Sequence, residues 1–412
     1  MSEVVAFGEV EPASLQQLER CLEVSGDDSR GVLCADHHKG YSMPIGGVVA
    51  SDRVVMPAGV GYDIGCGNCA VQTTLRAADV DVPKVMDEIW RTISFGMGRR
   101  NEERITEHPV FDAIAKSPVK AQRKELDNAR GQLGTVGGGN HYVDLFEDRA
   151  DGSLWVGVHF GSRGLGHKTA SGFLSLAAGR KWGERPADSM DARPAVIRLG
   201  TPLADDYLAA MNIAGEYAYA GRDWVVDRVL KILQTRAVQR VHNHHNFAWW
   251  EKHDATPTRE VRASGAPAGK KMLVIRKGAT PAFPGQKGFI GGSMGDDAVI
   301  VEGVDSTASR QALYSTVHGA GRVMSRTQAA GKINRRTGRQ VSRGVVNWPR
   351  WQEQLKAQGI ELRGGGPDEA PECYKRLTDV LAAHAGTIRV LHTLRPIGVA
   401  MAGKDTFDPY KD

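Results

Sequence analysis

Residues 133–166 run LGTVGGGNHYVDLFEDRADGSLWVGVHFGSRGLG, and this stretch decides the architecture that we expect for the chain. It contains two β-prone runs, 142–146 and 154–160. A glycine-rich loop precedes the first run and another follows the second, and His141 and His159 stand where the runs meet these loops. Because glycine lets a backbone approach a metal ion or a phosphate closely, we expect strands whose ends carry a functional site.

The same combination of reactive and small residues recurs on both sides of this stretch. Asp63 and Cys66 stand in the loop DIGCG, His245 lies in NHHN, and His318 opens HGAGR. A carboxylate, a thiol and several imidazoles in such surroundings suggest a metal centre assembled from distant parts of one fold, acting on a phosphate. Mixed ligation of this kind suits zinc, manganese or iron, and the sequence does not choose between them.

Cys66 and Cys69 also form a C-x-x-C pair, which is typical of zinc ribbons and thiol redox sites. No second pair exists, and Cys21, Cys34 and Cys373 lack ligand-like spacing, so a structural zinc site is disfavoured. We expect Cys69 to be a buried small hydrophobe. An odd number of cysteines without framework spacing suits a reducing compartment, and cytoplasm is the expected location.

Strand and helix patterns interleave without regular βαβ spacing, so the sequence predicts an α+β fold rather than a doubly wound sheet. No linker separates the motifs, and we expect one domain over residues 1–412. The glycines after His318 are expected to begin a helix whose N-terminus could cradle an anion. The other predicted elements are helices over 121–130, 203–238 and 370–383, and strands over 272–276, 298–301 and 388–394.

Charge and hydropathy favour a protein that does not act in a membrane. The net charge of +5 is only mildly basic for 412 residues, and no apolar run reaches membrane-spanning length. Residues 332–343 carry five basic side chains and no acidic one. This segment could contact a nucleic-acid backbone or could be a solvated loop.

Segments from about residue 34 to residue 403 together resemble the RtcB family of RNA-splicing ligases. The matching strings include DHHKGY at 36–41, DIGCG at 63–67, GTVGGGNH at 134–141, GSRGLGH at 161–167, HGAGRVMSR at 318–326 and APECYK at 370–375. The resemblance implies one large α+β domain of the RtcB type, with β-sheets flanked by helices around a central dinuclear metal cleft.

The resemblance also implies a GTP-dependent ligase that uses two Mn²⁺ ions. Such an enzyme joins an RNA 3′-phosphate or 2′,3′-cyclic phosphate end to a 5′-hydroxyl end. His318 would be the nucleophile that forms a histidine–GMP intermediate, and Asp36 would orient its imidazole. The implied metal ligands are Asp63 and His141 for one ion, His159 and His245 for the other, and Cys66 as the bridge.

Further contacts are implied for the nucleotide and for RNA. Guanidinium groups match phosphates bidentately, so Arg163, Arg322 and Arg326 are expected to clamp RNA phosphates, the alternative for each being an ion pair. The implied nucleotide contacts are Asn140, His141, Tyr142, Val143, Asp144, His245, Asn246, Gly291, Gly292, Ser293, Met294, His318, Gly319, Ala320 and Gly321.

Four positions depart from the family pattern. Asp144 stands where the family usually has Glu, Ala402 where it has a nucleotide-contacting Lys, Ala298 where it has Ser, and Gly221, just before Arg222, where it has Asn. These departures leave guanine selectivity open. One alternative is therefore a specialised paralogue that caps or repairs one RNA class, and another is a metal-dependent phosphodiesterase. We expect a monomer, and the resemblance raises the small activator archease as a partner.

Overall fold

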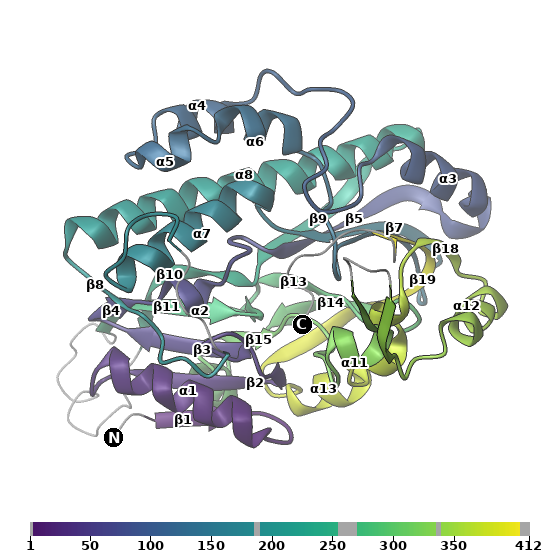
Figure 1. The fold of residues 1–412 in the computed structure, drawn as a ribbon. Coiled ribbons are helices and arrows are strands. Elements are labelled where there is room, and N and C mark those ends of the chain that lie inside the picture. Colours follow the sequence, from purple (N-terminus) through teal and green to yellow (C-terminus); the bar gives the residue numbers. More distant parts are fainter. Residues whose placement is uncertain (1–2, 185–189, 254–269, 335–338, 404–412) are drawn as a thin grey trace.

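The computed structural model describes residues 3–184, 190–253, 270–334 and 339–403 (Figure 1). Its larger sheet has eight strands, with β18 (Glu361–Gly364) paired to β19 beside the main path. Asn243 at one edge donates to the carbonyl of Lys287 at the other over 3.0 Å, so this sheet is nearly closed. The main path runs β13 (Lys287–Ile290), β14 (Ala298–Gly303), β19 (Ile388–Met401), β6 (Tyr142–Asp148), β7 (Ser153–Phe160), β5 (Gly67–Arg76) and β9 (Ala237–His244).

A second sheet of five strands adjoins the first one. Only His245 separates β9 from β10, so this residue lies where the two sheets meet. The second sheet has the order β1 (Glu3–Ala6), β2 (Arg30–His38), β3 (Ile45–Ser51), β11 (Lys270–Lys277) and β10 (Asn246–His253). The described residues also form three two-stranded pairs: β12 (Ala279–Pro281) with β15 (Ser315–Val317), β4 (Val54–Val55) with β8 (Ile197–Arg198), and β16 (Gly331–Asn334) with β17 (Arg339–Arg343).

Helices flank both sheets, as Figure 1 shows. The longest, α8 (Pro202–Ile232), packs along β5 and β7, and α7 (Arg163–Ala177) packs against it. On the second sheet, α1 (Pro12–Ser25) covers β2 and β3. The remaining helices are α2 (Pro57–Val60), α3 (Val82–Thr92), α4 (Pro109–Ala115), α5 (Lys120–Arg123), α6 (Leu126–Gln132), α10 (Thr307–Gln311), α11 (Arg326–Ala330), α12 (Trp348–Ala357) and α13 (Leu377–Ala383), with 3₁₀ turns at Ala77–Asp79, Pro367–Glu369 and Pro371–Cys373.

Local sequence explains why α8 can lie close to the strand ends. The Thr201 side chain caps its first turn by accepting from the amide of Ala204, and Pro202 occupies a position where a missing N–H costs nothing. Small residues then face the loop before β5: a Cβ on Gly65 would lie 3.1 Å from Ala218 Cβ and 3.2 Å from Gly215 Cα. The backbone of α8 therefore packs directly against this loop, with no side chain larger than a methyl group between them at Gly215 and Ala218.

The α+β fold is confirmed, as are the strands expected over 142–146 and 154–160. The helix predicted over 203–238 ends at Ile232, because the chain from Ala237 pairs with β5 as β9. The final strand runs on to Met401, with a register shift after Pro396 that accommodates the missing proline N–H. The single-domain expectation stays a prediction.

Three other expectations need correction. The helix predicted over 121–130 is divided into α5 and α6. The helix predicted over 370–383 begins only at Leu377, because 3₁₀ turns at two prolines precede it. In the described part of the basic segment, residues 332–334 and 339–343 lie in the paired strands β16 and β17 rather than in a loop, and Lys332, Arg339 and Arg343 are exposed. Arg335 and Arg336 lie outside the described residues, and contact with a nucleic acid stays a prediction.

No helix in the described ranges combines the length and apolar character needed to cross a bilayer.

Two tyrosines of α8 provide a test of this packing. The hydroxyl of Tyr217 donates to the carbonyl of Ala129 over 2.8 Å, whereas the buried hydroxyl of Tyr207 has no partner among the described residues. Tyr217→Phe should lower the free energy of unfolding by about 1 kcal/mol, because it removes a buried hydrogen bond while the carbonyl keeps the amide of Leu133 at 2.9 Å. Tyr207→Phe should leave it unchanged or raise it. Denaturant titration measures both, and equal losses would contradict the assigned environments.

Candidate metal centre and nucleotide pocket

Four neighbouring strands of the larger sheet bring four of the predicted metal ligands together at one end of these strands. His141 lies just before β6, His159 near the end of β7, Cys66 just before β5, and His245 just after β9. These neighbours are antiparallel, so the starts of β6 and β5 lie beside the ends of β7 and β9. Strand pairing therefore assembles residues that are far apart in the sequence.

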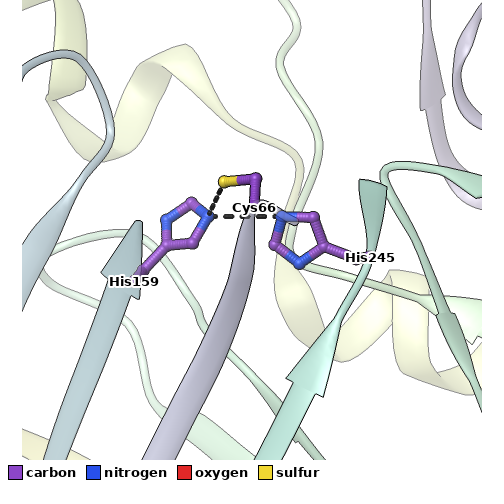
Figure 2. Close-up of side chains that lie close together, drawn as sticks. All are labelled: Cys66, His159 and His245. Atoms are coloured by element: carbon purple, nitrogen blue, oxygen red, sulfur yellow. Dashed lines mark hydrogen bonds between the residues drawn. The ribbon is translucent and has the colours of Figure 1, made fainter. Parts of the chain in front are cut away.

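The ligand atoms form two groups that share Cys66. Its Sγ lies 3.3 Å from Nε2 of His159, which lies 3.4 Å from Nε2 of His245; Figure 2 shows the thiol and both rings converging. On the other side, Sγ lies 3.6 Å from Nε2 of His141, which lies 3.1 Å from Oδ2 of Asp63. Within each group all ligand atoms lie within 4.8 Å of one another. This donor set fits two adjoining cations bridged by a thiolate.

Two glycines make this spacing possible. A Cβ on Gly161 would overlap the carboxylate of Asp63, and a Cβ on Gly67 would overlap the carbonyl of Asn243. Gly161 thus leaves room for the carboxylate of Asp63. Gly67 lets β5 and β9 approach each other beside Cys66 and His245.

Hydrogen bonds and burial prepare the imidazoles for metal binding. Nδ1 of His159 lies 3.0 Å from the carbonyl of Asn140, which holds the proton on that nitrogen and leaves Nε2 with its lone pair. Burial, and then neighbouring imidazoles, hold the pKa of His159 and of His245 well below the usual value. Both rings are therefore neutral at pH 7. Burial, and then the charge of Asp63, raise the pKa of the Cys66 thiol well above its usual value.

His141 has a different tautomer in this arrangement. Nη1 of Arg163 lies 3.0 Å from its Nδ1, and because a guanidinium can only donate, Nδ1 accepts. Nε2 then carries the proton and faces Asp63. Burial alone would raise the pKa of Asp63, but the hydrogen bond from His141 and the charge of Arg163 hold it below its ordinary range.

A third cluster, Cys69 with Asp223 and His242, has ligand-like spacing, but two of its side chains already bond to arginines. Nε2 of His242 accepts from Arg222 over 2.8 Å, and Asp223 pairs with Arg240. A cation on Nδ1 of His242 would require Arg222, which is fully buried, to give up this contact, whereas Arg163 beside His141 is partly exposed. Cys69 is fully buried, as expected. In the described part of the chain, the groups sharing Cys66 are thus the better candidates.

His318 lies beside the metal groups and is held by Asp36. Nδ1 of His318 lies 2.6 Å from Oδ2 of Asp36, which also accepts from the amides of His318 at 3.0 Å and Gly319 at 3.3 Å. Nδ1 therefore donates, and Nε2 keeps a free lone pair. The ring centroid lies 4.8 Å from that of His245. Sequence reasoning missed Asn68, whose amide donates to the carbonyls of Phe289 and His318 at 2.9 and 3.4 Å.

The helix expected after His318 is wrong. Residues 318–325 form a loop, and the next helix, α11, begins at Arg326. Gly321 has φ +77°, and a Cβ there would overlap the carbonyl of Asp36. The backbone must turn here to pass Asp36, so any anion contact would come from loop amides rather than from a helix end.

A cavity of about 560 Å³ opens beside His318. Val143 does not line it, because alternation along β6 turns this side chain into the core. Asn246 instead accepts from the amide of Gly278 over 2.8 Å and contacts the carbonyl of Asp63. The predicted nucleotide contacts that do line the cavity are Asn140, Tyr142, Asp144, Gly291, Gly292, Ser293, Met294, His318, Gly319, Ala320 and Gly321.

Two polar atoms in this cavity wall have no partner among the described residues, the hydroxyl of Tyr142 and Oδ1 of Asp144. Asp144 is only 6% exposed, and burial raises the pKa of its carboxyl well above the ordinary value. Met401 lines the cavity close by, whereas Ala298 is buried in the core. Lys404, the lysine nearest to Ala402 in the sequence, lies outside the described residues.

The three arginines that were expected to clamp RNA phosphates, Arg163, Arg322 and Arg326, already have partners. Arg326 pairs with Asp368 at 3.1 Å and with Glu369. Arg322 donates to the carbonyl of Asp368 at 2.8 Å and to the hydroxyl of Tyr374 at 3.0 Å. Both line the cavity, and carboxylates compensate their charge. Arg163 contacts His141, as described above. Their role as phosphate clamps stays a prediction.

Comparison with known proteins decides the family. The model of the family described as tRNA-splicing ligase RtcB matches residues 17–121 and 112–402. The chain belongs to the RtcB family. The RNA-splicing ligase RtcB of Escherichia coli (strain K12) is 30% identical over 94% of each chain. The tRNA-splicing ligase RtcB of Archaeoglobus fulgidus is 29% identical, over 95% of this chain and 91% of its own. The family resemblance inferred from the sequence is confirmed.

Proton release tests the metal centre of this RtcB-family chain. With the Cys66 thiol protonated and His159 and His245 neutral at pH 7, binding of cations to the thiolate should release about one proton. Apparent metal affinity should therefore rise by about tenfold per pH unit from pH 6.5 to 8.5. Co²⁺ titrations of metal-free protein measure this. Cys66→Ala should bind weakly with little pH dependence; a flat profile in the unchanged protein would remove Cys66 from the ligand set.

Proposed function

We propose that this protein is a GTP-dependent RNA ligase that joins 3′-phosphate to 5′-hydroxyl ends. The observation that carries the proposal is the convergence of two candidate ligand groups, sharing Cys66, next to the His318–Asp36 pair, with His159 and His318 lining one cavity. The family membership supports it, since the named relatives are RNA-splicing ligases. A metal-dependent phosphodiesterase would act through water and would use the same imidazole only as a general acid or base, so a covalent nucleotide on the protein distinguishes the two functions.

The first step uses Nε2 of His318 as the nucleophile. It attacks the α-phosphorus of GTP, an N–P bond forms, the bond to the bridging oxygen breaks, and pyrophosphate leaves. Asp36 accepts the Nδ1 proton in a hydrogen bond throughout, which keeps Nε2 aimed at the phosphorus and stabilises the positive charge that develops on the ring. Burial alone would raise the pKa of Asp36, but the charge of His318 and its hydrogen bonds keep it below the ordinary value, so the carboxylate is ionised.

Two further displacements complete the reaction. An oxygen of the RNA 3′-phosphate attacks the phosphorus of the histidine adduct, the N–P bond breaks, and the RNA end carries ppG. The 5′-hydroxyl of the second RNA then attacks the RNA phosphorus and expels GMP. A 2′,3′-cyclic end must first be opened by water to a 3′-phosphate.

Asp63, His141 and Cys66 would hold one divalent cation, and Cys66, His159 and His245 the other. Bound there, the two cations, Mn²⁺ by family resemblance, would share the negative charge of phosphate oxygens. The donor set fits them, because two imidazoles are neutral and one carboxylate is ionised at pH 7. Loss of the Nε2 proton of His141 on metal binding would turn Nδ1 into a donor. Arg163 would then have to leave it for another acceptor, such as an RNA phosphate.

Asp144 is the residue that would recognise the base. Guanine presents N–H donors at N1 and N2, and a buried carboxylate oxygen without a partner is costly unless such donors reach it. Adenine offers an acceptor at N1 and could pair only with the protonated acid, the form that burial favours, so guanine selectivity requires that Asp144 ionise when GTP binds. The absence of the family lysine at Ala402 favours, as a second candidate, a paralogue with weakened guanine selectivity. RNA is the proposed partner, with archease as an activator, a monomeric state and a cytoplasmic location.

Covalent labelling tests the central step. Incubation with α-³²P-GTP and Mn²⁺ should label the protein, and the label should be lost in acid and retained in alkali, as expected for an N–P bond. His318→Ala should abolish labelling, whereas His392→Asn, which changes a histidine outside the cavity, should retain it. Phosphate release from RNA without any covalent nucleotide would favour the phosphodiesterase instead.

Base selectivity gives a separate prediction for Asp144. Asp144→Asn should reduce labelling by GTP roughly 10- to 100-fold relative to ATP, because the amide presents a single acceptor and a competing donor. Asp148→Asn is the matched control: this carboxylate is also buried in β6 but pairs with His392 outside the cavity. It should leave the GTP/ATP ratio unchanged. Equal use of the two nucleotides by the unchanged protein would establish the paralogue.

A further inference from the structure

Arg222 in α8 is a fully buried cation directly behind the metal ligands. Its guanidinium lies over the ring of Tyr219, 5.2 Å from the centroid, and its hydrogen-bond partners are carbonyl oxygens and imidazole nitrogens. Nη1 lies 2.8 Å from the carbonyl of Gly65 and 2.5 Å from that of Phe160. Nη2 lies 2.9 Å from Nδ1 of His244, and Nε donates to Nε2 of His242 over 2.8 Å.

Three of these contacts fall next to a metal ligand in the chain. The carbonyl of Gly65 belongs to the peptide that enters Cys66. Phe160 directly follows His159, and His244 directly precedes His245. One planar guanidinium therefore joins the three segments that carry the ligands drawn in Figure 2.

We propose that Arg222 is the positioning residue of the metal centre, holding the segments of Cys66, His159 and His245 at the spacing that the cations require. The proposal rests on the metal centre of the proposed function. Arg222 itself contacts no ligand atom; it acts through the backbone and through His244.

Geometry explains why an arginine is needed here. The N–H donors of a guanidinium lie in one plane and point outward in fixed directions. A single arginine can therefore fix the positions of acceptors on several sides of the group at once. A lysine carries the same charge but offers a single, freely rotating donor group. A buried cation is costly unless its donors are satisfied, so the site must supply acceptors at fixed places, and here the ligand-bearing segments supply them.

The chain offers a matched control in Arg276. This arginine is also fully buried, but its contacts are Glu251 at 2.6 and 3.1 Å, the hydroxyl of Ser315 at 2.8 Å and the carbonyl of Leu313 at 2.8 Å. None of these residues neighbours a ligand of the cations. Arg276→Lys should therefore cost stability without changing how the cations are held.

The test is a Co²⁺ titration of metal-free, full-length protein, followed by the thiolate-to-cobalt absorption band. Arg222→Lys should bind Co²⁺ about 10- to 100-fold more weakly and with a weaker band, the size of effect seen when groups that orient metal ligands are removed. Arg276→Lys should bind as the unchanged protein does, at a comparable loss in melting temperature.

A second variant covers the case in which Arg222→Lys does not fold. His242→Phe removes the acceptor of Nε but keeps the guanidinium, and it should weaken Co²⁺ binding several-fold. Affinity and band intensity like those of the unchanged protein, in either folded variant, would overturn the proposal and leave Arg222 a stabilising residue only. If the unchanged protein itself gives no thiolate-to-cobalt band, the metal centre fails, which is a separate outcome.

Discussion

The backbone pairing of β6, β7, β5 and β9 is the constraint on which the rest of the site depends. Antiparallel neighbours place the start of one strand beside the end of the next, so the four strand ends that carry candidate metal ligands lie together. A slip of one residue in β7 would turn His159 to the opposite face of the sheet. Tight packing keeps the register, since a Cβ on Gly157 would overlap the ring of Phe146. The geometry of the candidate metal site therefore depends on the strand register as much as on the identity of its side chains.

Burial then gives each group its protonation state. The same exclusion of water that keeps His159 and His245 neutral keeps the Cys66 thiol protonated until a cation arrives. Asp36 behaves differently, because His318 and two backbone amides surround one of its oxygens and favour the ionised form. The fold therefore places two neutral imidazoles, a thiol that ionises only with a compensating charge, and an ionised carboxylate around the proposed nucleophile.

Sequence patterns predicted the parts of this site that depend on local chemistry. Glycine-flanked ligands at strand ends are visible in the chain, and the structure brings those residues together. The contacts of Arg222 and the pairing of Arg326 with Asp368 were not predictable, because they join segments that carry no shared local signal. The end of α8 was missed for a related reason: pairing with β5 overrides the apolar periodicity from residue 237 onward.

In the proposed centre, two cations lie together beside His318 and share Cys66 as a ligand. Anomalous diffraction from crystals soaked in Mn²⁺ would locate these cations. We expect two peaks on either side of the Cys66 sulfur, one towards Asp63 and His141 and the other towards His159 and His245. A single peak, or occupancy confined to Cys69 and His242, would contradict this expectation.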